Sequence, residues 1–466
     1  MARNRDFYRT IRLVSITASC LILAHPAWAG RPGESLGRTH TSVERISPER
    51  LKAAHEDVAR HQSNRVSLPL LPGLTDYRAA IHLHADDSNH TGGTLPELLE
   101  DAKRGGVQIV MLSDHVRPPR DFMDGWRGMR DGVLFIPGAE AKGFLLYPDA
   151  SVMDAINGPK EELIKATTQG TGLIFLSHVE ERVSHSMEGL TGMEIYNRHH
   201  DAADDMDMLF AVASMMTDPK RLPVIEEALR LYHDEVLASQ LDYPELYLSK
   251  WDEESQKQPV VGVGAIDCHH NQVLVVKMVD EKTVLLGTNV DADDEMRKLT
   301  ADVRPGIAEM TKGRKPGDIL ARLDFDTYYH SFRTMSTHIL APELSEDAVR
   351  AALNAGHAYV SHDWMCDPTG FRFMAVPKGQ ASGDLRAGSL HIMGDELPYR
   401  ANVLLVAEFP VDCAVRLLKN GEVVSESTGR RLEHAPDGSG TYRVEGWLKV
   451  DGEDRAWIYS NPIYLR

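Results

Sequence analysis

Residues 75–90 read TDYRAAIHLHADDSNH, an apolar run that ends in three histidines. We predict a strand over residues 77–83, on which the two-residue spacing turns His82 and His84 to the same face. His90 follows in the next loop. Because imidazole is a preferred ligand of zinc, manganese and ferrous ions, this stretch predicts one part of a metal site at the end of a buried strand.

The same arrangement recurs downstream, where further apolar runs are each followed by side chains that can bind a metal. The runs cover residues 107–112, 133–136, 172–176 and 260–265, and the side chains after them are Asp114, His115, Glu140, His178, Asp267 and His269. The runs are apolar throughout, which is typical of parallel strands covered on both faces. Barrel enzymes of the βα type place their chemistry at the carboxyl ends of such strands, so we expect these side chains to converge.

Eight of these residues are candidate metal ligands: His82, His84, His90, His115, Glu140, His178, Asp267 and His269. Asp114 is expected beside them, accepting a hydrogen bond from a ligand ring and thereby fixing its tautomer. Cys268 is expected to point away from the site, because neighbours in a strand face opposite sides.

The composition argues against several other classes of protein. The 466 residues include 51 basic and 69 acidic side chains, a net charge of −18, with no basic run, so we expect no nucleic-acid partner. A GxxxxGK[ST] phosphate-binding loop is absent from the sequence, which argues against a nucleoside triphosphatase. Cys268, Cys366 and Cys413 are the cysteines after residue 29, and their odd number argues against a disulfide framework.

The first 29 residues have the pattern of a signal peptide. Four arginines between residues 3 and 12 precede a short apolar stretch, Leu13 to Ala24, and Ala27-Trp28-Ala29 offers a cleavage site. We therefore expect cleavage after Ala29 and a periplasmic or secreted protein, with an uncleaved anchor as the alternative. Elsewhere the sequence has no run that approaches the roughly 18 apolar residues of a spanning helix, so we expect no membrane span after cleavage.

The remaining chain divides into three regions by pattern. Residues 30–75 form a polar lead-in with one helix over residues 48–62, and residues 76–375 form an α/β barrel. Within the barrel we expect a helical insertion at about 198–258 and a charged, loop-like region at about 280–317. Short strands with an Asn420-Gly421 hairpin turn then predict a small β-sandwich over residues 385–466.

Over residues 76–275 the ordered motifs resemble the PHP (polymerase and histidinol phosphatase) superfamily. The motifs are His82-Leu83-His84, His90, Asp114-His115, Glu140, His178 and Asp267-Cys268-His269. The resemblance implies a distorted (β/α)7 barrel and a phosphoesterase that uses a hydroxide bridging two or three divalent ions of zinc, manganese or iron. It further implies that His82, His84, Glu140 and Asp267 hold one ion and that His90, His115 and His269 hold another. The closing SNPIY, residues 460–464, and the β-sandwich look like the secreted branch that includes carbaryl-hydrolase-like metallohydrolases.

The chain departs from this family in one respect. The three-metal members carry a further histidine shortly after the glutamate, where this chain has Lys142-Gly143-Phe144-Leu145. We therefore expect two firmly bound ions, and a third only where a neighbouring loop supplies the missing ligand. His185, Asn197, His199 and His200 are the candidates for it.

Three arginines are candidates for binding the phosphate group of a small-molecule ester substrate. Arg117 and Arg120 follow the Asp114-His115 motif, and Arg198 follows the strand predicted over residues 192–196. Guanidinium groups suit phosphate oxygens because their donors form a planar fork. Two alternative functions remain: hydrolysis of a carbamate or carboxylic ester at the same centre, and a non-catalytic binding protein with a relic barrel.

Overall fold

The structure, a computed structural model, describes residues 37–87, 90–379, 390–400 and 402–466. The predicted signal peptide, residues 1–29, lies outside the described residues. These described residues belong to one compact unit. Across the described ranges, none of the helices combines the length and the apolar character needed to cross a lipid bilayer.

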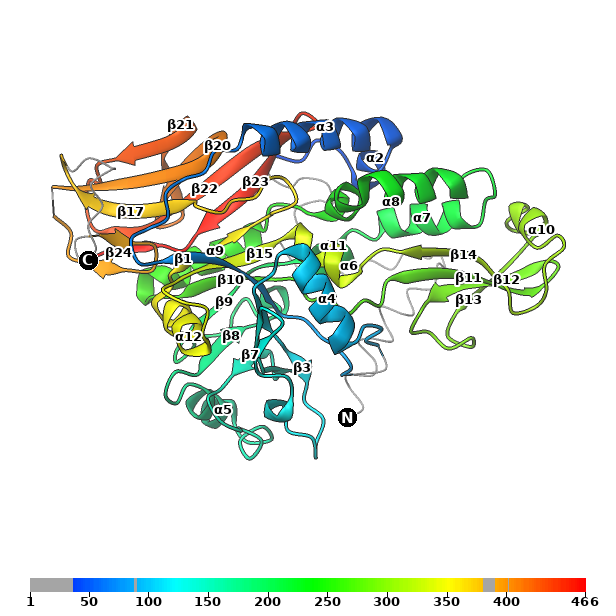
Figure 1. Cartoon of the computed structure of the whole chain (residues 1–466), viewed down its shortest axis with the longest axis horizontal. Coiled ribbons are helices and arrows are strands. Elements are labelled where there is room, and N and C mark those ends of the chain that lie inside the picture. The colour runs from blue at the N-terminus through cyan, green and yellow to red at the C-terminus, as the bar shows by residue number, and fades with distance from the viewer. Residues whose placement is uncertain (1–36, 88–89, 380–389, 401) are drawn as a thin grey trace. The chain divides into compact units, whose positions relative to one another are not determined.

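The apolar runs of the first half form strands that alternate with helices, as predicted (Figure 1). The main elements are β1 (Thr75–Ile81), α4 (Leu95–Gly105), β2 (Ile109–Met111), β3 (Asp114–His115), β5 (Val133–Ile136), β6 (Ala139–Ala141), β7 (Phe144–Tyr147), α5 (Lys160–Thr167), β8 (Leu173–Leu176), β9 (Gly192–Asn197) and β10 (Val261–Ala265), with short η1 (Phe122–Asp124), β4 (Gly128–Arg130) and η2 (Val179–Glu181) between them. Five neighbouring pairs are parallel: β1–β2, β2–β5, β3–β6, β8–β9 and β9–β10. The fold is therefore of the mixed α/β class with parallel strands, although β7 runs antiparallel to both of its neighbours.

The stretch after β1 lies hydrogen-bonded between the stretches that follow β2 and β10. On one side the amide of Ser113 donates to Leu83 O at 3.0 Å. On the other side the amide of Ile266 donates to Ile81 O at 3.1 Å and the amide of Asp267 to His82 O at 2.7 Å. These bonds bring the carboxyl ends of β1, β2 and β10 to one place.

The helical insertion predicted for about residues 198–258 is present as α6 (Arg198–Asp204), α7 (Asp207–Met216), α8 (Leu222–Leu237), η3 (Ala238–Gln240) and α9 (Glu245–Lys257). The capping box expected at the start of α4 is also present. The side chain of Thr94 accepts from the amide of Glu97, and the side chain of Glu97 accepts from the amide of Thr94.

The prediction of a loop-like region over residues 280–317 is wrong. This part of the chain belongs to an antiparallel sheet in the order β13-β12-β11-β14, with bounds β11 Val273–Asp280, β12 Thr283–Thr288, β13 Arg297–Thr300 and β14 Ile319–Asp324, and a short helix α10 Gly306–Met310. One face is buried: Val276, Val284 and Leu323 pack in a core cluster with residues of α7 and α8. The other face carries the charged side chains that made the region resemble a loop.

The second half of the chain extends the sheet from the edge of β1 that does not pair with β2. Its elements are α11 (Tyr328–Thr334), β15 (Ser336–Ala341), α12 (Glu346–Ala355), β16 (Ala358–Ser361), β17 (Arg372–Pro377), β18 (His391–Ile392), β19 (Glu396–Leu397), β20 (Val403–Lys419), β21 (Glu422–His434), β22 (Gly440–Val450), β23 (Glu453–Ser460) and β24 (Ile463–Leu465). β15 pairs antiparallel with β1, β16 with β15, and β23 with β16. One sheet of 14 described strands thus runs without a break from β1 to the C-terminal strands (Figure 1). The predicted turn at Asn420-Gly421 joins β20 to β21, with both residues at positive φ.

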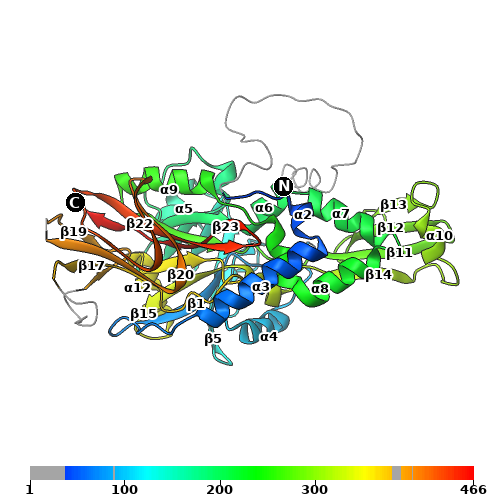
Figure 2. The ribbon, with the colours of Figure 1, turned by 90° about the horizontal axis from the view of Figure 1, so that it is seen from above.

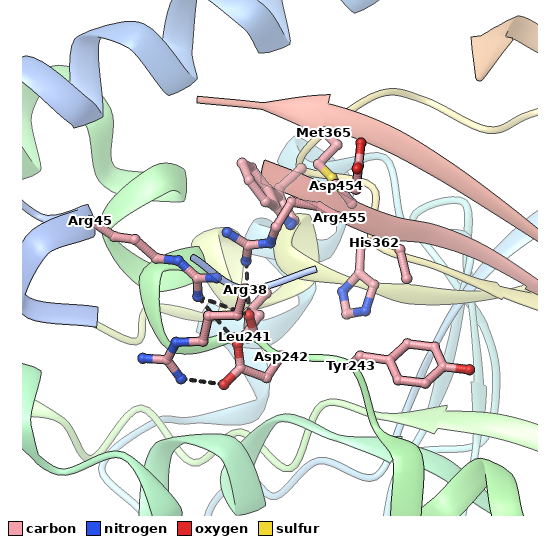
Figure 3. A pocket seen from close by; sticks show the side chains of 11 residues that line it. Arg38, Arg45, Leu241, Asp242, Tyr243, His362, Met365, Asp454 and Arg455 are labelled. Carbon is pink, nitrogen blue, oxygen red and sulfur yellow. Dashed lines mark hydrogen bonds and ion pairs between the residues drawn. The ribbon is translucent and has the colours of Figure 1, made fainter. Parts of the chain in front are cut away.

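The lead-in holds two helices, α2 (Ser42–Arg45) and α3 (Pro48–Asn64), of which α3 matches the predicted one and packs against α8 and β22 (Figure 2). Ion pairs hold the start of this segment in place, and those of Arg38 and Arg45 with Asp242 are visible in Figure 3. Arg38 pairs with Asp205 at 2.7 Å and also with Asp242, and Arg45 pairs with Glu453 of β23 at 2.8 Å. The lead-in is thereby tied to the helical insertion and to a C-terminal strand.

A buried charged network joins β1 to β15. His338 of β15 has Nδ1 2.7 Å from Asp76 Oδ1, and its Nε2 is 3.5 Å from Asp363 Oδ1. Burial opposes protonation of the ring, but the two carboxylates outweigh it and raise the pKa of His338 to about 10.

Replacing His338 by glutamine should destabilise the protein most at mildly acidic pH. Because the pKa of His338 is raised from 6.5 to about 10, its stabilisation is complete below the unfolded value and is lost as the pH rises through the folded one. We expect the free energy of unfolding to fall by about 3–5 kcal/mol at about pH 6, since carboxylate charge is left buried without its partner. Urea unfolding of both proteins at about pH 6 and about pH 10 measures the difference, and an equal loss at both would contradict a charged His338.

Candidate metal centre

Three of the candidate ligands sit where the backbone leaves a parallel strand in a left-handed conformation. His82 has φ 60°, His178 has φ 46° and Asp267 has φ 49°, shortly after β1, β8 and β10. This conformation costs a non-glycine residue of order 1–3 kcal/mol and concentrates at functional sites. The strand predicted over residues 77–83 accordingly ends at Ile81, yet the rings of His82 and His84 still lie together, 5.4 Å apart at their centroids.

Around Asp267 and Glu140 the ring nitrogens of several histidines converge. Nε2 of His82 lies 3.4 Å from Asp267 Oδ1 and 3.7 Å from Glu140 Oε2. Nε2 of His178 lies 3.2 Å from Glu140 Oε1 and 3.5 Å from Asp267 Oδ2. Nε2 of His115 is 3.5 Å from Glu140 Oε2. Side chains separated by up to 185 positions in the sequence, from His82 to Asp267, therefore share one small volume.

Seven of the eight candidate ligands fall into overlapping groups whose donor atoms could hold a common ion. The groups are His84, His115 and His269; His82, His84 and Asp267; and His82, Glu140 and His178. The eighth, His90, lies beside the first group, with its ring centroid 5.1 Å from that of His115 and 5.0 Å from that of His269. A fourth group consists of His84, Asp87 and Asp114.

The donors fit divalent ions of the zinc, manganese and iron type. Nε2 of His82, His84 and His269 is buried and has no hydrogen-bond partner among the described residues. A buried polar nitrogen without a partner is costly, and a metal ion would satisfy several of them at once. Neutral imidazoles combined with two carboxylates form the donor set that such ions prefer.

The same geometry shifts the acid–base properties of the site. Burial opposes protonation of His82, but Asp267, Glu194 and Glu140 outweigh it and raise its pKa to about 10. Burial likewise opposes ionisation of Asp267, yet the surrounding imidazoles, His82 first, hold the pKa of its carboxyl far below the usual range. Burial acts in the opposite sense on other rings of the cluster and lowers the pKa of His84 and of His269.

Sequence reasoning missed three buried or half-buried carboxylates behind the ligand rings. Asp87 lies 2.6 Å from Nδ1 of His115, Glu194 lies 2.6 Å from Nδ1 of His82, and Glu180 lies 3.1 Å from Nδ1 of His178. The sequence held a signal for two of the three: Asp87 is three residues after His84, and Glu194 is a charged residue inside the buried strand β9.

Asp114 lies beside the candidate ligands, in the group with His84 and Asp87, where it contacts the backbone. The hydrogen bond to a ligand ring that we predicted for it is made by Asp87, while Asp114 Oδ1 accepts from the amide of Ala85 at 3.1 Å. Burial and the charge of Asp87 raise the pKa of Asp114 to about 7.

The three predicted arginines separate into two kinds. Arg117 and Arg120 are exposed in the loop after β3, and Arg120 Nη2 lies 3.8 Å from Asp114 Oδ2 at the edge of the centre. Arg198 is buried, and its Nη1 donates to Ser331 Oγ of α11 at 3.4 Å. Its charge acts on Cys268, a buried free cysteine that belongs to none of the ligand groups found among the described residues. Arg198, the first residue of α6, is therefore buried against α11, whereas Arg117 and Arg120 are exposed.

Of the four candidates for the missing ligand, His199 lies beside the ring of His178. Its ring centroid is 6.4 Å from that of His178, and its charge helps to lower the pKa of Asp267. His185 packs on Phe144, and His200 lies against Tyr247. Asn197 uses its side-chain oxygen to cap α6, accepting from the amides of His199 and His200.

Comparisons with known proteins give little further information. Neither the protein-family models nor the curated proteins contain a match to the sequence. Among solved structures, a two-domain protein from Bacteroides vulgatus ATCC 8482, described as containing a predicted PHP-like metal-dependent phosphoesterase, is similar with a TM-score of 0.35 and 12% sequence identity. The alignment covers 86% of this chain and 98% of that chain.

Replacing His84 by alanine should remove bound metal, because His84 contributes to more than one ligand group. After manganese loading and dialysis, we expect the variant to have lost about one ion per chain or more relative to the wild type. Inductively coupled plasma mass spectrometry measures the content. The matched control is His362→Phe, which replaces another buried histidine, one whose ring packs on Tyr196 instead of the centre. Equal metal content in H84A and wild type would contradict the assignment.

Proposed function

We propose that this protein is a metal-dependent hydrolase of phosphoesters, built on a distorted (β/α)7 barrel of the PHP type with an appended C-terminal β-sandwich. The observation that carries the proposal is the convergence of seven candidate ligands from separate strand ends, among which Nε2 of His82, His84 and His269 is buried without a hydrogen bond to any described residue. The hydrogen bonds that return β10 to β1 support the barrel. The ordered sequence motifs support the superfamily, and the closing SNPIY supports its secreted branch.

The ligand groups suggest how ions would be distributed. His82, Glu140, His178 and Asp267 would hold one ion, and His84, His115 and His269, with His90 beside them, a second. His199, whose ring lies 6.4 Å from that of His178, would supply a further ligand at a third position. When bound, such ions supply Lewis acidity, which lowers the pKa of water and neutralises charge on the attacked ester.

The protein's own side chains would bind and orient the substrate at this centre. Arg117 and Arg120 are exposed at its edge, where they would bind the oxygens of an anionic ester. Asp114 would hold the loop after β1 in place through Ala85 and stand beside Arg120. We further propose that residues 1–29 direct the protein to the periplasm or the exterior.

The test compares four substrate classes on one preparation of wild-type protein loaded with manganese, zinc or ferrous ions. We expect turnover of a phosphate monoester or diester, and Asp267→Asn should reduce it at least about 100-fold, because the ions contribute several kcal/mol. Turnover of an aryl carbamate or carboxylic ester alone would favour the alternative substrate. No turnover of any class by protein with its ions bound would contradict a hydrolase.

Substitution of Arg120 by alanine separates the substrate classes further. The variant should show a raised KM for the phosphoester and an unchanged KM for a neutral carbamate, because only the former needs a cation at the edge of the centre. His362→Phe is again the control, and its steady-state kinetics should match those of the wild type.

A further inference from the structure

We propose that Asp87 and Glu194 are positioning residues, each of which orients the ligand histidines of one half of the metal centre. The inference rests on the proposed function, because it assigns these carboxylates a role toward the ions. It goes beyond that function in dividing the centre into two halves that are supported separately.

Asp87 supports the half that contains His84, His115 and His269. Its Oδ2 lies 3.2 Å from Nδ1 of His84 and 2.6 Å from Nδ1 of His115, and it also accepts from the amide of His115 at 2.9 Å. Its Oδ1 accepts from the hydroxyl of Thr91. The side chain is fully buried. One carboxylate thus fixes two rings of the same ligand group.

Glu194 supports the half that contains His82, Glu140 and His178. Its Oε1 lies 2.6 Å from Nδ1 of His82, and its Oε2 accepts from the amide of His178 at 2.8 Å. Oε2 also accepts from Nδ2 of Asn197 at 3.1 Å, and Asn197 in turn caps α6, which carries His199. This side chain is fully buried as well.

The chemical consequence lies in the ring tautomers. A neutral imidazole carries its proton on one nitrogen and a lone pair on the other. A carboxylate at Nδ1 holds the proton there, so the lone pair of Nε2 is directed into the centre, where Nε2 of His82 and His84 has no other hydrogen-bond partner in the described chain. Loss of such outer partners typically costs 10–100-fold in metal affinity.

In a purely structural role, these carboxylates would only neutralise buried imidazoles and would not affect metal binding. The chain contains a matched carboxylate–imidazole pair that serves as a control for this alternative. Asp76 is also buried, lies 2.7 Å from Nδ1 of His338 and accepts from a backbone amide, that of Gly370. Asp76 and His338 are outside every ligand group found among the described residues.

The experiment uses the full chain with Asp87→Asn, Glu194→Gln and Asp76→Asn. Manganese titration gives the affinity and stoichiometry of each variant, and anomalous difference density from manganese-soaked crystals shows which position is lost. We expect D87N to weaken the ion at His84, His115 and His269 by about 10–100-fold, and E194Q to weaken the ion at His82, Glu140 and His178 to a similar degree. D76N should lower stability and leave both ions in place.

Equal weakening of both positions by each substitution, or unchanged binding in both variants, would overturn the proposal. Where D87N or E194Q does not fold, Thr91→Val and Glu194→Asp provide milder changes at the same carboxylates, with smaller losses expected at the same positions. Wild-type protein that binds less than about one ion per chain would sink the proposed function itself. If the wild type binds its ions and both variants bind them with the same affinity, the positioning role alone is contradicted.

Discussion

The centre depends on the backbone hydrogen bonds that hold the end of β1 between its two neighbours. The amide of Asp267 donates to His82 O, and the amide of Ser113 donates to Leu83 O. These bonds join the residues that follow β1, β2 and β10 through the backbone alone, without any side chain. Because His82 and His84 follow β1 and lie between the residues that follow β2 and β10, their rings meet candidate ligands from both sides.

Electrostatics adds a second constraint. Asp87, Glu140, Glu194 and Asp267 are buried or nearly buried around the same rings. Carboxylates can remain ionised at such depth only beside cations, which explains the raised pKa of His82 and the lowered pKa of Asp267. Metal ions would displace protons from this cluster, so ion binding and protonation compete for the same sites.

The sequence was sufficient to predict the parallel strands and the converging ligands, because both depend on local pattern. Strands buried on both faces read as uniform apolar runs, and their ends then locate His115, Glu140 and His178. Glu194 could not be assigned in this way, since its partner His82 is 112 positions distant. The burial of Arg198 was not predicted, because it depends on packing beside Ser331, which is 133 positions distant in the sequence. The sheet β11–β14 was missed because one face is exposed and charged, which weakens the apolar signal of a strand.

The continuity of the large sheet has a consequence for how the chain folds. β23 covers the edge of β16, which in turn supports β15 and then β1. Removal of the C-terminal strands would expose the edge of β16, which is two strands away from β1 in the sheet. The unpaired backbone groups of that edge would favour aggregation. The region with the candidate ligands and the C-terminal region are therefore expected to unfold together, as one cooperative unit rather than as modules that can be exchanged.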